Sequence, residues 1–321
     1  MTNDRIVTNE EEPREERKSD RTTGNPLIIL AGATGDLGQR IADYLLKSGA
    51  TVRALVRPGS DPRKLDALRQ QGVAVVAVDF SDAAALTQAC TGGFCLVSAL
   101  SGLRDVIVEL QTKLLRAAVE AGVPRFIPSD YCIDFTKLAP GSNRNLDLRR
   151  EFQERLDRAP IAATSILNGM FTDLLNGQAP VVLFGLKRVL YWGDADQPMD
   201  FTTIDNTAAF TAAAALDPDT PRFLRIAGEV ATVRDLRKAA SAATGNEFGL
   251  FRMGGLGVLD FMINVTRTLF PQNQEVFPPW QGMQYLRNML SGQPKLDPLD
   301  NDRYPHIRWT SVQEVLKNRS S

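Results

Sequence analysis

Three glycines with a fixed spacing follow an apolar run, and residues of this type at this spacing can bind a phosphate group. Gly32, Gly35 and Gly38 come after Leu27 to Ala31, which reads as a buried strand, and before a segment with helical apolar spacing. Gly32 would let the chain turn sharply, Gly35 would remove a Cβ beside a pyrophosphate, and Gly38 would let helix and strand pack closely. The pyrophosphate would lie on the free N–H groups and positive dipole end of the helix. An ordinary loop would not need a strand and a helix on its two sides, so the pattern predicts a dinucleotide site that includes Gly32, Thr34, Gly35, Asp36, Leu37 and Gly38.

A cation at the end of the next strand selects between cofactors. The second apolar run, Val52 to Val56, ends in Arg57. An acidic residue there would accept hydrogen bonds from a ribose 2′-OH, whereas a cation accommodates a 2′-phosphate. We therefore expect NADP(H) rather than NAD(H). The alternative is that Arg57 is a solvated charge at the start of a helix.

The elements that would position these residues alternate regularly along the chain. Further strands are expected over 73–78, 94–100 and 125–127, separated by helices over 61–71, 81–90 and 103–121. Such units imply right-handed crossovers, and they predict an α/β fold with a doubly wound parallel Rossmann sheet. The ligand should lie across the carboxyl ends of the strands. Ser98, in the fourth strand, and Asn168, after a sixth strand over 161–167, therefore join the expected cofactor site.

The pattern changes after Met170. Two apolar stretches around Gly185 indicate a hairpin, a later strand leads into a helix capped by Asn206, and 254–292 is helical. The apolar surface of that last region comprises Leu256, Leu259, Met262, Ile263 and Phe270, a stripe more typical of a core than of a ligand site. We interpret 26–170 as the NADP(H)-binding Rossmann domain and 171–321 as a smaller, mostly helical substrate domain, with 195–230 returning to the Rossmann domain.

Composition excludes several other classes of protein. The chain has 321 residues, 43% of them hydrophobic, and a net charge of -1, which gives no general attraction to nucleic acid or to an acidic membrane surface. Residues 1–25 are charged and nearly free of apolar side chains, which predicts a disordered arm. No apolar run is long enough to cross a membrane, no secretory signal is visible, and three cysteines without a CxxC pair suggest a reducing compartment, so we expect a cytoplasmic protein. No metal-ligand cluster is visible.

The order of motifs resembles the NmrA-like and isoflavone-reductase-like atypical short-chain dehydrogenases. The resemblance covers nearly everything after residue 26 and depends on GATGDLG, Arg57, FIPSDY, TSILNGMF and DFTTIDNTAAFTAAAAL. It implies an NADP(H)-binding Rossmann domain, a small C-terminal substrate domain and a cleft between them. It also implies that Asp79, with Phe80 beside it, meets the adenine amino group; a cap for the helix over 81–90 is the alternative. Some members of the family reduce small aromatic or enone-like substrates, and others bind the dinucleotide and act as regulators.

The catalytic position departs from the family. None of the five tyrosines has a lysine four residues later, so the Y-x-x-x-K pair is missing. The isoflavone-reductase-like lysine falls here on Arg149, and an arginine cannot give or take a proton near neutral pH. Arg149 could hold an anionic group, or it could be a surface residue of a charged helix. The remaining candidates are Tyr131 and Ser129, just past the fifth strand, and Lys137 on the following loop. We expect a neighbouring cation to lower the pKa of Tyr131. The single histidine, His306, is expected to be structural.

These observations favour an NADPH-dependent reductase that transfers hydride to a small, largely apolar carbonyl or enone. The alternative is a non-catalytic NADP(H)-sensing regulator of the NmrA-like type, which a protein partner would then accompany. The missing proton-donor signatures favour the regulator, and the intact cofactor site fits either hypothesis. A sugar-nucleotide epimerase would need the absent Y-x-x-x-K pair.

Overall fold

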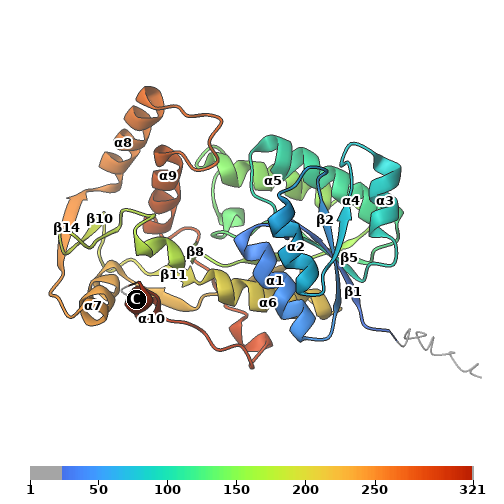
Figure 1. Ribbon diagram of the computed structural model, residues 1–321. Helices are drawn as coiled ribbons and strands as arrows, with labels where there is room; N and C mark the ends of the chain where they lie inside the picture. Colours follow the sequence, from blue (N-terminus) through green and yellow to red (C-terminus); the bar gives the residue numbers. More distant parts are fainter. Residues whose placement is uncertain (1–23, 320–321) are drawn as a thin grey trace, which may run out of the picture.

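Six parallel strands form the central sheet of the N-terminal part of the computed structural model, which describes residues 24–319 (Figure 1). Their order across the sheet is β3-β2-β1-β4-β5-β6. The strands are β1 Leu27–Ala31, β2 Thr51–Val56, β3 Ala74–Ala77, β4 Cys95–Ser98, β5 Arg125–Ile127 and β6 Ala162–Ala163. The chain order reverses between β1 and β4, and such a switch point is where open α/β sheets bind ligands. The predicted α/β class and Rossmann sheet are confirmed; the arm expected over 1–25 lies almost wholly outside the described residues.

Helices cover both faces of this sheet. The N-terminal part contributes α1 Asp36–Lys47, α2 Pro62–Gln70, α3 Ala83–Cys90, a π-helical segment η1 Asp105–Leu110 that continues into α4 Gln111–Glu120, a short turn η2 Phe135–Lys137, and α5 Arg144–Leu156. Ile28 and Leu30 of β1 pack in one apolar cluster with α1, and Ile29 and Ala31 pack in another with α3 and α4. Both faces of β1 are therefore buried, as its continuous apolar run predicts.

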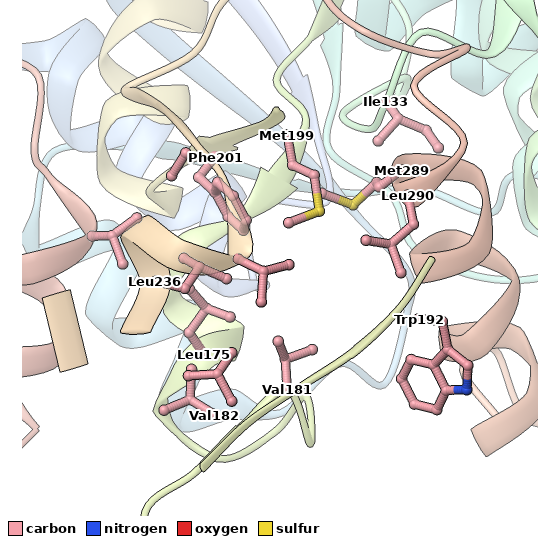
Figure 2. Packing of buried hydrophobic residues seen from close by; sticks show 14 of the residues in the cluster. Ile133, Leu175, Val181, Val182, Trp192, Met199, Phe201, Leu236, Met289 and Leu290 are labelled. Carbon is pink, nitrogen blue, oxygen red and sulfur yellow. The ribbon is translucent and has the colours of Figure 1, made fainter. Parts of the chain in front are cut away.

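Two small sheets and four helices make up most of the C-terminal part. The strands are β8 Met170–Phe171, β9 Val182–Leu183, β10 Arg188–Trp192, β11 Met199–Thr202, β13 Glu229–Ala231 and β14 Gly249–Gly254, in the orders β14-β10-β9 and β13-β11-β8. The helices are α7 Val233–Thr244, α8 Leu256–Leu269, α9 Pro279–Leu290 and α10 Val312–Asn318, with short 3-10 turns η3 Thr172–Asn176 and η4 Asn301–Arg303. Figure 2 shows part of their shared core, an apolar cluster that includes Met199, Phe201 and Leu236 together with Met289 and Leu290 of α9. The hairpin predicted around Gly185 is confirmed as β9 and β10, and the helices of this part hold more residues than its short strands.

The expected sixth strand divides in two. The N–H of Thr164 donates to Phe126 of β5, but the next N–H, that of Ser165, donates to Arg222 outside the central sheet. The chain therefore changes partner at this point, and β7 Ser165–Leu167 pairs in parallel with β12 Phe223–Arg225.

One helix from the second half of the chain covers the first half. α6 Ile204–Leu216 packs along α1, and Phe210 of α6 lies in the same cluster as Ile28 and Leu30. Its N-cap is Thr203, whose hydroxyl accepts from the N–H of Asn206, so the prediction that Asn206 is the cap is wrong. Asn206 instead donates from its side chain to the Arg308 carbonyl at 2.8 Å, which fixes the C-terminal segment.

Candidate functional site

The glycine turn brings strand β1 and helix α1 closer than side chains would allow. Gly32 has φ +90°, and a Cβ there would lie 2.5 Å from the Ala99 carbonyl oxygen. A Cβ on Gly38 would lie 2.2 Å from the Gly32 carbonyl oxygen. Both values are far below van der Waals contact, so the roles expected for Gly32 and Gly38 agree with the geometry.

The first turn of α1 presents free N–H groups. Gly35 is the N-cap, has an exposed backbone and supplies no side-chain cap, so the N–H groups of Asp36, Leu37 and Gly38 have no acceptor within the helix. The Asp36 carboxylate turns aside to accept from Arg40 at 2.8 Å. A Cβ on Gly35 would meet nothing closer than 3.4 Å, so no contact within the protein requires this glycine. The turn is a cradle of the kind that holds a pyrophosphate.

The far side of the switch point carries the residues expected around the adenosine. Arg57 is exposed at the end of β2, and its guanidinium has no ion-pair or hydrogen-bond partner among residues 24–319. Asp79 is also exposed; its carboxylate accepts from the Ser81 N–H and from the Ser81 hydroxyl, both at 2.8 Å, and these bonds lower its pKa. The cap of α3 is Asp82, so Asp79 organises the turn before the helix and is not the cap itself. Phe80 is half-buried beside it.

On the β4 side of the switch point, several buried polar atoms have no hydrogen-bond partner within the described part of the chain. They stand at the carboxyl ends of β4, β5 and β7: Ser98 Oγ, Asp130 Oδ1 and Asn168 Oδ1. Asn168 uses its amide nitrogen on Thr207, at 3.3 Å, and Asp130 accepts from the Ser165 hydroxyl at 2.7 Å. Unpaired buried polar atoms are costly, and their alignment along the strand ends fits a polar ligand that would bind them.

Tyr131 differs from its expected environment. Its side chain is 7% exposed and packs with Ile28, Leu30 and Phe210 on the α1 and α6 face of the sheet. The hydroxyl lies near Thr211 without a hydrogen bond of acceptable geometry. Burial raises its pKa well above its usual range, and neither Lys137 nor Arg149 acts on it. The predicted lowering by a neighbouring cation is therefore wrong, because the tyrosine points into a core.

The Lys137 side chain is bound to the segment that follows α9. Its ammonium donates to the Lys295 carbonyl at 2.7 Å and lies 3.7 Å from the Asp134 carboxylate. These contacts tie η2 to the chain after α9. The structure therefore does not bring Lys137 to Tyr131.

Arg149 lies on the opposite face of the sheet from Tyr131, because α5 packs with the α3 and α4 cluster through Phe152. It is half-buried, Nη1 donates to the Asn145 carbonyl at 3.0 Å, and Nε is buried with no hydrogen-bond partner in residues 24–319. Its charge acts on Asp130 and Cys132 just past β5 and on Tyr285 of α9. It is therefore not a surface residue of a charged helix.

Tyr285 of α9 interacts electrostatically with Arg149, and the sequence does not lead to an expectation for it. The sequence predicts a helical segment with an apolar surface over 254–292. The amide side chains of Gln281, Gln284 and Asn288 nevertheless recur on one face of α9. Buried amides at helical spacing in an apolar region indicate a polar contact, and Tyr285 lies on the same face.

Other features lie away from this site. A cavity of about 460 Å³ between the ends of α4 and α5, lined by Leu115, Arg116 and Arg158 among others, is at the amino ends of the strands. His306 is exposed near the C-terminus. Within residues 24–319 no group of three or more metal-ligating side chains is present, and none of the described helices could cross a membrane.

The fold and the site define a dinucleotide-binding α/β protein with a second domain at the carboxyl ends of its strands. The chain belongs to the NmrA-like family, whose model matches residues 24–257, and this confirms the resemblance seen in the motifs. Pinoresinol reductase 1 of Arabidopsis thaliana is 27% identical over 314 residues, which cover 92% of this chain and 98% of that protein.

Solved structures agree on the fold. The structure of AtPrR2 with NADP+ and (+)pinoresinol has a TM-score of 0.76 at 23% identity and covers 93% of this chain and 100% of that chain. The NADPH-dependent quinone oxidoreductase of Escherichia coli complexed with NADPH has a TM-score of 0.71 at 20% identity, covering 92% and 100%. Both comparisons span the two domains.

Proposed function

We propose that this protein is an NADPH-dependent reductase that transfers hydride to a small, largely apolar carbonyl or enone. The observation that carries the proposal is the glycine cradle at the start of α1 together with the unpaired Arg57 at the end of β2. Similarity to a reductase over nearly the whole of both chains supports it. The cofactor is NADP(H), and the second substrate is a small molecule.

The cofactor would lie across the switch point in a fixed direction. Gly32, Thr34 and Gly35 to Gly38 would hold the pyrophosphate, Arg57 the 2′-phosphate, and Asp79 with Phe80 the adenine. Ser98 and Asn168 would then meet the nicotinamide half, because Ser98 ends β4 and the Asn168 N–H donates to the Cys132 carbonyl just past β5. The bound cofactor supplies the hydride, and the protein supplies orientation and charge.

Arg149 acts at the reacting end of the site. Carbonyl reduction places negative charge on the substrate oxygen, and a fixed guanidinium in a half-buried place stabilises that charge. Its Nε has no hydrogen-bond partner within the described residues and is free to donate. Arginine cannot supply the proton itself, so the proton must come from another group or from water.

The test is NADPH oxidation with a panel of 1,4-naphthoquinone, 4-nitrobenzaldehyde and 4-phenyl-3-buten-2-one, after NADPH binding has been measured by calorimetry. We expect tight binding and turnover of at least one panel member. Arg149→Met should lower kcat by about 10²-fold without changing the NADPH affinity. Failure to bind NADPH would contradict the cofactor site.

A second candidate is a dinucleotide-sensing regulator that does not turn over. Arg149 at the family's lysine position and the core placement of Tyr131 favour it, because both remove an expected proton donor. Tight NADPH binding without oxidation by any member of the panel would favour the sensor over the reductase.

A further inference from the structure

A row of polar side chains on helix α9 contacts the start of α5. Gln281 donates to Asn143 at 2.6 Å, Asn143 donates to Asn288 at 3.2 Å, and the Arg144 N–H donates to Gln284 at 3.3 Å. Every one of these five side chains is buried or half-buried. We call this set of contacts the α5–α9 seam, and it fixes the rotation of α9 relative to α5.

The loop before α9 is tied down by the same helix start. The Arg144 guanidinium donates to the Glu275 and Val276 carbonyls at 2.9 Å each and stacks over Trp280, with its central carbon 4.7 Å from the ring centroid. Trp280 is fully buried and donates to the Pro271 carbonyl at 2.8 Å. The first turn of α9 therefore has little freedom to shift.

The seam brings together the helices that carry Tyr285 and Arg149, and these two side chains interact electrostatically. Tyr285 shares a helix face with Gln281 and Asn288, and Arg149 lies one helical turn beyond Asn145 on α5. The Tyr285 side chain is half-buried, and its hydroxyl has no hydrogen-bond partner among the described residues. Burial raises the pKa of Tyr285 to about 12, and the Arg149 and Arg144 charges oppose that rise. Tyr285 thus combines a free hydroxyl with a cation that stabilises its ionised form.

We propose that Tyr285 and Arg149 bind the substrate oxygen from the two domains and that Tyr285 is its proton donor. This inference depends on the proposed reductase function. Hydride adds to the carbonyl carbon, the carbonyl π electrons move to oxygen, and the Tyr285 O–H bond breaks as the new O–H bond forms. The tyrosinate is held by Arg149 until water returns a proton to it. The overall change consumes one hydride and one solvent proton.

Two of the other candidates lack these properties. Tyr131 faces α6 on the opposite side of the sheet, and the Lys137 ammonium is occupied by the Lys295 carbonyl and Asp134. Cys132 is near Arg149, but its thiol is buried and already donates to the Asp130 carbonyl at 3.2 Å.

The kinetic test compares Tyr285→Phe with Tyr191→Phe on a substrate that the wild type reduces. Tyr191 is also half-buried in the C-terminal part, but it lies on β10 near Arg234 of α7 and away from α5. We expect Tyr285→Phe to lower kcat by about 10²-fold with an unchanged NADPH affinity, and Tyr191→Phe to stay within about twofold. Equal kcat values for Tyr285→Phe and wild type would overturn the assignment. Tyr285→Phe should keep the wild-type melting temperature because the hydroxyl has no partner to lose.

A binding test works without turnover. 4-Nitrophenol is a probe for the oxygen site because its ionised form is coloured and resembles a developing oxyanion. With NADP+ present, wild type should bind the phenolate and deepen its colour at constant pH; Tyr285→Phe and Arg149→Met should each weaken binding roughly tenfold or more. If both variants bind the phenolate with the wild-type affinity, or if the wild type does not bind it, the proposed oxygen site is overturned. Binding that depends on both residues, with no turnover of any substrate, would refute the reductase function and leave the site in place.

Discussion

Single side chains at the ends of strands carry most of the expected specificity of this protein. Arg57 is exposed and unpaired within the described chain, whereas its neighbour Arg63 already interacts with Asp61 at 3.5 Å. The Arg57 guanidinium at the end of β2 therefore forms no ion pair or hydrogen bond that would stabilise the described part of the fold. Its position is explained if it binds a phosphate.

Arg57→Ala should separate the two nicotinamide cofactors. A charge-assisted bond to the 2′-phosphate contributes about 1.5–3 kcal/mol, so NADPH affinity should fall roughly tenfold or more while NADH affinity stays nearly constant. Calorimetric titration with each cofactor measures both values. Arg69→Ala is the matched control, because Arg69 lies in the last turn of α2 and pairs with Asp66. Equal losses for NADPH and NADH would return Arg57 to a structural role.

For single residues, the sequence predicts the place of a side chain along an element better than the direction in which the side chain points. The cradle glycines and Arg57 follow from strand ends and spacing, because backbone geometry alone places them. Tyr131 also follows a strand end, yet which face of the sheet its ring covers depends on α6, more than 70 residues later in the sequence. Tyr285 could not be paired with Arg149 from the sequence because the hydrogen bonds of the α5–α9 seam join residues 138 to 145 positions apart.

Helix α8 shows how two apolar faces on one element behave differently. Leu259 and Ile263 are buried, and the helix packs on α9. On the other face Phe261 is 67% exposed and Leu269 is 65% exposed. The core-like stripe expected from the sequence agrees with the burial of Leu259 and Ile263, whereas its last member, Phe270, is 59% exposed.

The two faces of α8 should respond differently to substitution. Leu259→Ala should lower the free energy of unfolding by about 2–5 kcal/mol because it leaves a cavity. Phe261→Ser should change it by no more than about 0.5 kcal/mol because the ring is already in water. Urea unfolding of both variants gives the values. A loss for Phe261→Ser as large as that for Leu259→Ala would mean that the face is covered in solution.

The two halves of the whole molecule are interleaved and are not joined end to end. The cluster on the α1 face of the sheet includes Phe210 and Leu224, and Tyr304 and Ile307 from near the C-terminus. β7 has its partner in β12. The expected return of 195–230 to the Rossmann domain includes Phe210 and Leu224, whereas Tyr304 and Ile307 lie beyond that range.

A fragment of residues 24–170 should not fold by itself. It lacks α6 and β12, so the apolar faces of α1 and β1 would stay in water. Circular dichroism during heating should show a cooperative transition for residues 24–319 and none for the fragment. A cooperative transition in the fragment, together with NADPH binding, would show that the second half is dispensable for the sheet.

The α5–α9 seam is a polar contact, so water can hydrogen-bond to its groups when the two helices separate. Parting α1 from α6 would expose leucine and alanine side chains, at about 25 cal/mol for each Å² of apolar surface. Parting α5 from α9 would uncover the amides of Asn143, Gln281 and Asn288, and water would replace their hydrogen bonds at a small net cost. Polar contacts therefore hold the α5–α9 seam, whereas apolar contacts hold α1 against α6.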